Sequence, residues 1–311
     1  MLDRLFMIMG LTLYLFDYGS DIYVAIQYWK NDDYWWFGIV IGLIVVPSII
    51  VNITAIIQLT NIWRSILAFL QLSIVVRYIE TLKSPHPSRS YSLARLRYLE
   101  TITESAPQWC LQVYIMLRQW SFPWYTVVSS VLSLLSLAWS ITTLEKQRKL
   151  HRREVCRRRH AVLFLIWQLS TLVSRLSATV IVLYVFGYYV FIFLAVHWLI
   201  VTTAMLMVPP KDFSCKSIML SCLAGYPSLF HSSETVLPTA SPKDEMIVGH
   251  TSIVIGNALS IVSLFLAHEI PDVQNMDVLK PVVISCITGG TVLSMIFLII
   301  YYRCMACDAS N

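Results

Sequence analysis

Long apolar segments recur along the whole 311-residue chain, separated by short polar or charged stretches. A helix needs about 20 residues to cross the hydrocarbon core of a bilayer, and eight of the ten segments can do so. The segments cover residues 5–28, 36–59, 64–80, 98–117, 123–143, 161–186, 188–208, 216–230, 247–267 and 281–302. The pattern therefore predicts an all-α polytopic membrane protein with eight transmembrane helices.

Two segments are shorter and more polar than the others. Arg77 interrupts the segment 64–80, and Ser221 and Pro227 interrupt the segment 216–230. We expect both to be short re-entrant helices. Each half of the chain then has two long segments, a short one and two more long ones, which predicts two pseudo-symmetric repeats. Paired interrupted segments at corresponding positions are typical of the substrate site in transporter-like proteins.

The distribution of Lys and Arg predicts the orientation in the membrane. Residues 144–160 carry eight Lys and Arg against two acids, whereas the loop with Asp32 and Asp33 is acidic. Because basic loops stay in the cytosol, eight spans place both termini there. The predicted organisation is a first repeat, a basic cytosolic loop, a second repeat and a short cytosolic tail, at residues 1–143, 144–160, 161–303 and 304–311.

Composition excludes several classes of protein. Hydrophobic residues make up 57% of the chain and charged residues 13%, and the mean hydropathy is +0.67. A soluble protein could not bury so much apolar surface. The sequence has no nucleophile elbow, glycine-rich phosphate loop or zinc-ligand spacing, so we expect neither an enzyme nor a cofactor or metal site. We interpret the Lys- and Arg-rich segment 144–160 as a signal for membrane topology rather than as a nucleic-acid site.

Ionisable residues within the predicted spans are the candidate functional groups. A charge at the centre of a membrane helix costs about 2.5 kcal/mol or more, so such groups face a protein interior or a wet path. Asp17 and Asp21 lie four residues apart on one face of the first helix, and Glu100 and Glu104 repeat that spacing. Gln108 extends the second face, which gives the fourth segment a polar stripe.

Two further residues complete the candidate site. Pro107 lacks an N–H and predicts a helix break about one turn earlier. Arg175 is central in the segment 161–186, and we expect it to meet the acids in a buried charge ladder. Such a ladder serves either to fix helix register or to guide a polar solute, and the sequence leaves both readings open.

Two stretches resemble a known family. Residues 15–23, LFDYGSDIY, and residues 99–108, LETITESAPQ, are similar to segments of the XK-related (Kell blood group precursor-related) proteins. The resemblance implies a plasma-membrane phospholipid scramblase that exposes phosphatidylserine on apoptotic cells, with eight spanning and two re-entrant helices in two repeats. It also implies that intramembrane charges guide lipid headgroups. By position these are Asp17, Asp21, Glu100 and Glu104, with Arg175 as the basic partner.

The sequence therefore predicts ATP-independent lipid movement, with membrane phospholipids as partners. A proton-coupled secondary transporter or channel would use the same repeats and acids. A third reading is a non-transporting subunit that accompanies another membrane protein. Lipid scrambling needs no gradient, whereas coupled transport responds to pH or membrane potential.

Overall fold

The computed structural model describes residues 2–57, 73–84, 86–152, 157–207, 215–231, 242–266 and 276–309. This part of the chain is built from helices and contains no strand, so the predicted all-α class is confirmed. The chain divides into two compact units, Met1–Leu165 and Ile166–Asn311.

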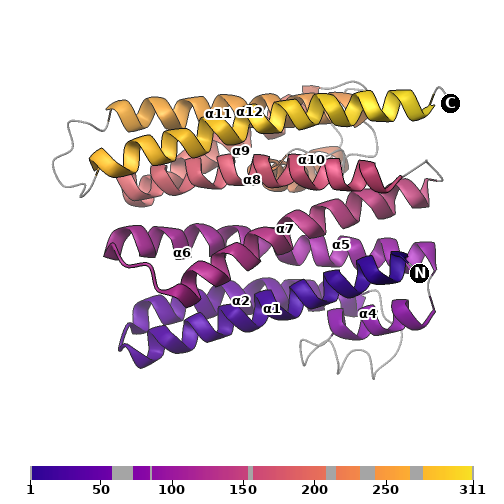
Figure 1. The fold of residues 1–311 in the computed structure, drawn as a ribbon, viewed down its shortest axis with the longest axis horizontal. Helices are drawn as coiled ribbons and strands as arrows, with labels where there is room; N and C mark the ends of the chain where they lie inside the picture. Colours follow the sequence, from indigo (N-terminus) through magenta and orange to yellow (C-terminus); the bar gives the residue numbers. More distant parts are fainter. Residues whose placement is uncertain are drawn as a thin grey trace. The chain divides into compact units, whose positions relative to one another are not determined.

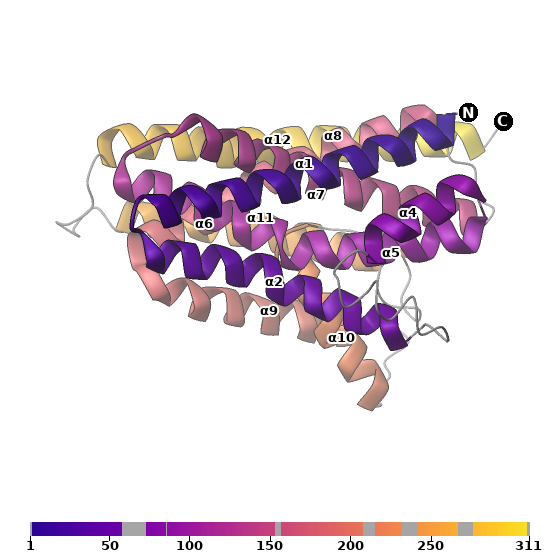
Figure 2. The same cartoon turned by 90° about the horizontal axis from the view of Figure 1, so that it is seen from below.

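The first unit is a bundle in which α1 and α5 both pack on α7. Figures 1 and 2 show α1 beside α7, and the short α4 beside α5. Its helices are α1 (Leu2–Lys30), α2 (Tyr34–Ile57), α4 (Ser73–Lys83), α5 (Pro87–Thr103), α6 (Ser105–Gln119) and α7 (Trp124–His151).

The second unit is also helical, and α9 contacts both α10 and α11. The boundary between the units falls within α8, after Leu165. The elements of the second unit are α8 (Arg158–Phe186), the 3₁₀ turn η1 (Gly187–Tyr189), α9 (Val190–Met207), α10 (Cys215–Ser228), α11 (Pro242–Leu266) and α12 (Met276–Ala309).

Many large apolar side chains lie on the outside of the bundles, whereas several charged side chains lie inside. Phe191 is 69% exposed and Leu223 is 60% exposed, whereas Asp21 and Arg175 are completely buried. Within the described residues, five helical stretches are long and apolar enough to cross a membrane. This arrangement is expected for a bundle whose outer solvent is lipid.

One of the five stretches, Arg158–Met207, is 50 residues long and contains two helices. The chain turns at Gly187, whose φ of 57° lies in the left-handed region that glycine tolerates. Arg175 on α8 then contacts His197 on α9, so the two helices form a hairpin. The apolar part of α2 is shorter, at Tyr34–Ile49. The count of eight spans stays a prediction, as do the two repeats.

The fourth predicted segment, 98–117, is two helices rather than one. The α5 helix begins at Pro87, ends at Thr103, and is separated from α6 by Glu104. Pro107 explains the interruption, because it has no N–H to donate to the carbonyl four residues earlier, and its ring crowds that carbonyl. The break therefore falls at an acid of the candidate site.

The predicted loop 144–160 is partly helical, because α7 continues to His151. Its residues favour helix, and Glu145 pairs with Arg148 and with Lys149 at 3.5 Å, one turn further along. The predicted tail 304–311 is likewise helical as far as Ala309, where α12 ends.

The two short segments differ in how much of them is described. Residues 64–72 lie outside the described residues, and the remainder of the segment 64–80 forms part of α4. The segment 216–230 corresponds to α10, which has only 14 residues. Whether either segment is re-entrant stays a prediction.

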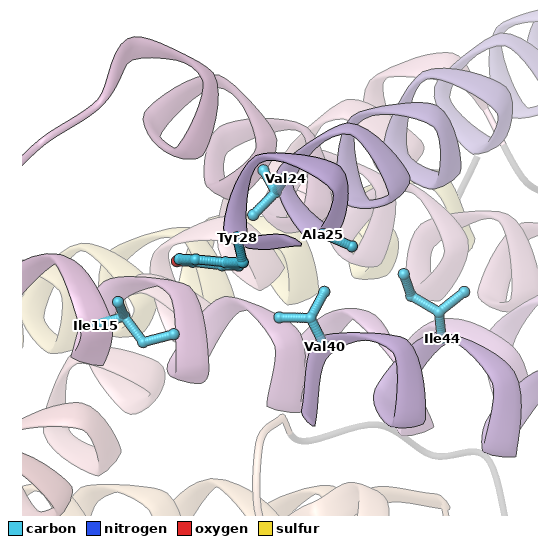
Figure 3. Close-up of a cluster of buried hydrophobic side chains, with 6 residues drawn as sticks. All are labelled: Val24, Ala25, Tyr28, Val40, Ile44 and Ile115. Atoms are coloured by element: carbon cyan, nitrogen blue, oxygen red, sulfur yellow. The ribbon is translucent and has the colours of Figure 1, made fainter. Parts of the chain in front are cut away.

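A compact apolar cluster joins α1, α2 and α6 (Figure 3). Figure 3 shows its members, each 7% exposed or less: Val24, Ala25, Tyr28, Val40, Ile44 and Ile115. Because lipid is as apolar as these side chains, the cluster stabilises the fold by close packing and not by removing apolar surface from water.

We expect Ile44→Ala to lower the free energy of unfolding by about 2 kcal/mol, at the low end of the range for buried Ile because the transfer contribution is small. Ile49 is the matched control, since it lies on the same helix and is 45% exposed. Unfolding in detergent checks both variants. Equal losses would contradict the assignment of Ile44 to a packed cluster.

Candidate functional site

A stripe of serines on α7 forms one wall of a buried polar cluster in the first unit. Its members, each 5% exposed or less, are Ser129, Ser130, Ser133, Ser136 and Ser140. Apart from the neighbouring pair at 129 and 130, they follow one another at three or four residues, so they share one helix face. Sequence reasoning missed this stripe, although its spacing was a visible signal.

Asp17 lies at the centre of the cluster. Its Oδ1 accepts a hydrogen bond from Ser133 Oγ at 2.7 Å, and its Oδ2 accepts one from Ser105 Oγ at 3.1 Å. The guanidinium of Arg97 is 3.8 Å from Oδ2. This one carboxylate therefore connects α1 with α5, α6 and α7.

Arg97 is the main cation of the cluster, and it lies just before the segment 98–117 that the sequence predicts as a span. Its side chain is buried and donates from Nη1 to Glu100 Oε2 at 2.5 Å and from Nη2 to Ser136 Oγ at 2.5 Å. Its guanidinium carbon lies 4.4 Å from the centre of the Tyr14 ring. The spacing of Arg97 and Glu100, three residues apart on a helix, was the available signal.

Asp21 marks the other end of the cluster. Its Oδ1 accepts hydrogen bonds from Ser129 Oγ at 2.6 Å and from Gln112 Nε2 at 3.0 Å. Gln112 Oε1 in turn accepts one from Ser130 Oγ at 3.0 Å. Among the described residues, Asp21 Oδ2 and both polar atoms of Gln108 have no hydrogen-bond partner, although Gln108 is near the Asp21 carboxyl.

Glu104 occupies the interruption between α5 and α6. Its side chain is 5% exposed, and its carboxyl group makes no hydrogen bond or ion pair with any described residue. Its charged neighbours include Glu100, Asp17 and Asp21. The break thus presents a free carboxyl group inside the bundle.

The charges of this cluster do not balance. Four carboxyl groups, those of Asp17, Asp21, Glu100 and Glu104, lie around one guanidinium in the described part of the first unit. Buried charges persist only when they are paired or neutralised. Some of these carboxyl groups must therefore hold a proton or be paired with a positively charged group.

Arg175 is the predicted partner of these acids, and it lies in the second unit. Its completely buried side chain donates from Nε to the carbonyl of Leu229 at 2.7 Å, and its Nη2 lies 3.3 Å from Nδ1 of His197. The cation that contacts Asp17 and Glu100 is Arg97. A meeting of Arg175 with the acids stays a prediction.

The contact with Arg175 determines the protonation of His197. Because a guanidinium only donates, Nδ1 of His197 accepts, and the proton of the neutral ring is on Nε2. Gly256 on α11 makes this arrangement possible, because a Cβ there would lie 2.6 Å from Arg175 Nη1 and 2.8 Å from His197 Cε1.

An apolar groove of about 440 Å³ adjoins His197 between α9 and α11. Phe193, Ile200, Ile255 and Leu259 contribute to its walls. The described residues contain no group of three His, Cys, Asp or Glu side chains placed to hold a metal ion.

Buried charges inside an all-helical bundle with apolar outer faces define an all-α membrane protein. The chain belongs to the XK-related family, because the XK-related protein family matches residues 5–306.

The chain is similar to three named relatives of this family. It is 25% identical to XK-related protein 8 of Tetraodon nigroviridis over 236 residues, and 22% identical to that of Gasterosteus aculeatus over 245 residues. Each alignment covers 65% of this chain and 58% of the relative. XK-related protein 9 of Tetraodon nigroviridis is 26% identical over 215 residues, which are 68% of this chain and 55% of the relative. The chain thus spans between half and two thirds of each relative's length.

We expect Arg97→Gln to lower the free energy of unfolding by about 3–5 kcal/mol, since it leaves the carboxylates of Asp17 and Glu100 buried without their cation. Arg95→Gln is the matched control, because Arg95 lies on the same helix and is exposed. Thermal unfolding in detergent measures both. A loss for Arg95→Gln as large as that for Arg97→Gln would contradict the assignment.

Gly256→Ala should destabilise the second unit by about 1–3 kcal/mol, because the added methyl group overlaps Arg175 and His197. Gly289→Ala provides the comparison, since a Cβ at Gly289 meets nothing within 4 Å. Differential scanning fluorimetry of the two purified variants is the measurement. The proposed contact is wrong if Gly256→Ala is as stable as Gly289→Ala.

Proposed function

We propose that this protein is an ATP-independent phospholipid scramblase, which lets lipids such as phosphatidylserine move between the leaflets of the plasma membrane, as in apoptotic cells. The observation that carries the proposal is the buried polar cluster of the first unit, with its excess of carboxyl groups. Membership of the XK-related family supports it.

The polar face of α7 is long enough for this task. Its buried polar side chains run from Ser129 to Glu145, which is about 24 Å at 1.5 Å per residue. The hydrocarbon core is about 30 Å thick. Polar side chains of α7 therefore line most of the distance that a headgroup travels across the hydrocarbon core.

The energetic obstacle to lipid movement is the desolvation of the headgroup, because burying its charges and polar atoms without partners is costly. In the proposed path, the carboxyl groups of Asp21 and Glu104 accept the cationic part of a headgroup, and the serines of α7 offer hydrogen bonds to its oxygens. The acyl chains stay in lipid.

Contacts within each unit support the proposed cytosolic position of both termini. In the first unit, Lys146 near the basic end of α7 lies 4.3 Å from the ring of Phe6, near the start of α1. In the second unit, the ring centres of Trp167 and Tyr301 are 5.9 Å apart. Trp167 lies in the first third of α8, and Tyr301 lies near the end of α12. The start of α1 therefore lies beside the basic segment that the Lys and Arg distribution assigns to the cytosol, and the end of α12 lies beside the helix that follows this segment.

Proton-coupled transport is the second candidate. The specific observation in its favour is the excess of buried carboxyl groups over cations, because such groups also form proton relays. A scramblase moves lipid without a gradient, whereas a coupled transporter depends on one.

The test is reconstitution of the purified chain in liposomes that contain fluorescent phospholipid in both leaflets. We expect an added membrane-impermeant quencher to extinguish clearly more than half of the fluorescence, without ATP or a pH gradient. Quenching that stops at half would contradict the proposal. Activity only with a proton gradient would favour transport, and inactivity of the pure chain would favour a subunit role.

Glu104→Gln should slow lipid movement about tenfold, equivalent to ~1.4 kcal/mol of barrier, while folding is retained. Retention is expected because the carboxyl group of Glu104 has no ion-pair partner to lose among the described residues. Asp32→Asn is the control, since Asp32 is exposed and its φ of 60° suits Asn equally well. An unchanged rate for Glu104→Gln would remove this acid from the path.

A further inference from the structure

Two small cavities adjoin one another in the first unit, beside the beginning of α1. They have volumes of about 10 and 20 Å³, and both are lined by Gly10, Tyr78, Ala94, Trp139 and Thr143. A cavity needs roughly 10–15 Å³ to hold one water molecule. The pair therefore has room for water and not for a larger ligand.

Beyond this shared wall, the two cavities are lined by different residues. The smaller one reaches Arg97 and Ser136, which belong to the buried charged cluster. The larger one reaches Phe6 and Gln147, near the start of α1 and the basic end of α7. Together they lead from that end of the unit to its principal buried cation.

Several polar groups line these cavities. The indole Nε1–H of Trp139 has no acceptor among the described residues. The side chain of Tyr78 lines both cavities, and those of Ser90 and Gln147 line the larger one. Buried polar groups without protein partners are normally satisfied by ordered water.

Gly10 provides the space between these groups. A Cβ at this position would lie 3.0 Å from the hydroxyl oxygen of Tyr78 and 3.2 Å from Nε1 of Trp139. A methyl group would thus enter the volume next to both polar atoms. By contrast, a Cβ at Gly19, on the same helix, would meet nothing within 4 Å.

We propose that these cavities hold a short file of ordered water molecules that connects the basic end of α7 with the Arg97 cluster. Trp139 donates to the file, Tyr78 and Gln147 bond to it, and Gly10 leaves it room. The passage hydrates the charged cluster and is too narrow for a lipid headgroup, which must reach the cluster by another route. This site is distinct from the proposed lipid movement and does not depend on it.

Hydroxyl-radical footprinting by X-ray radiolysis tests the proposal, because radicals form from water and label side chains that contact it. The probe is water itself, and the full chain is used in lipid nanodiscs. Tyr78 is 5% exposed and Tyr98 is 4% exposed, but Tyr98 does not line the cavities. We expect Tyr78 to be labelled several-fold faster than Tyr98.

Gly10→Ala should reduce the labelling of Tyr78 to near the rate of Tyr98, whereas Gly19→Ala should leave it unchanged. Trp139→Phe keeps an aromatic ring, removes the donor, and should also slow the labelling. It provides a second variant if Gly10→Ala does not fold. Equal labelling of Tyr78 and Tyr98 in the unmodified protein would overturn the proposal, as would unchanged labelling in a folded Gly10→Ala or Trp139→Phe variant.

Discussion

The first unit depends on the buried guanidinium of Arg97. Arg97 contacts Glu100 on its own helix, Asp17 on α1 and Ser136 on α7, and it lies over the ring of Tyr14. A buried charge is tolerated only where opposite charges and hydrogen bonds surround it. The positions of α1, α5 and α7 are therefore linked through one side chain, and changes to these helices must preserve its partners.

The same constraint leaves a surplus of acid that packing does not explain. Arg97 contacts two carboxylates, whereas Asp21 retains an oxygen without a hydrogen-bond partner, and Glu104 sits at a helix break without an ion pair among the described residues. This incomplete pairing at a helix interruption supports the proposal that these acids make transient contacts with a moving polar group.

Much of the fold and the acidic residues could be predicted, because hydropathy and the cost of intramembrane charge are properties of local sequence. The burial of Asp17, Asp21, Glu100 and Glu104 agrees with that reasoning. Arg97 could not be assigned in the same way, because loop counting treats any Arg near a span as a surface charge. The α5 helix extends back to Pro87, and Arg97 is buried there because this helix packs against α1 and α7.

Arg97 acts as the counter-ion of Asp17 across α1 and α5, and a double-mutant cycle of these two residues measures that pairing directly. The free energy of unfolding is determined for the unmodified chain, Asp17→Asn, Arg97→Gln and the double variant. A coupling of about 1–3 kcal/mol is predicted, since each single change leaves the other group partly unpaired. A coupling within error of zero would contradict the central role of this ion pair.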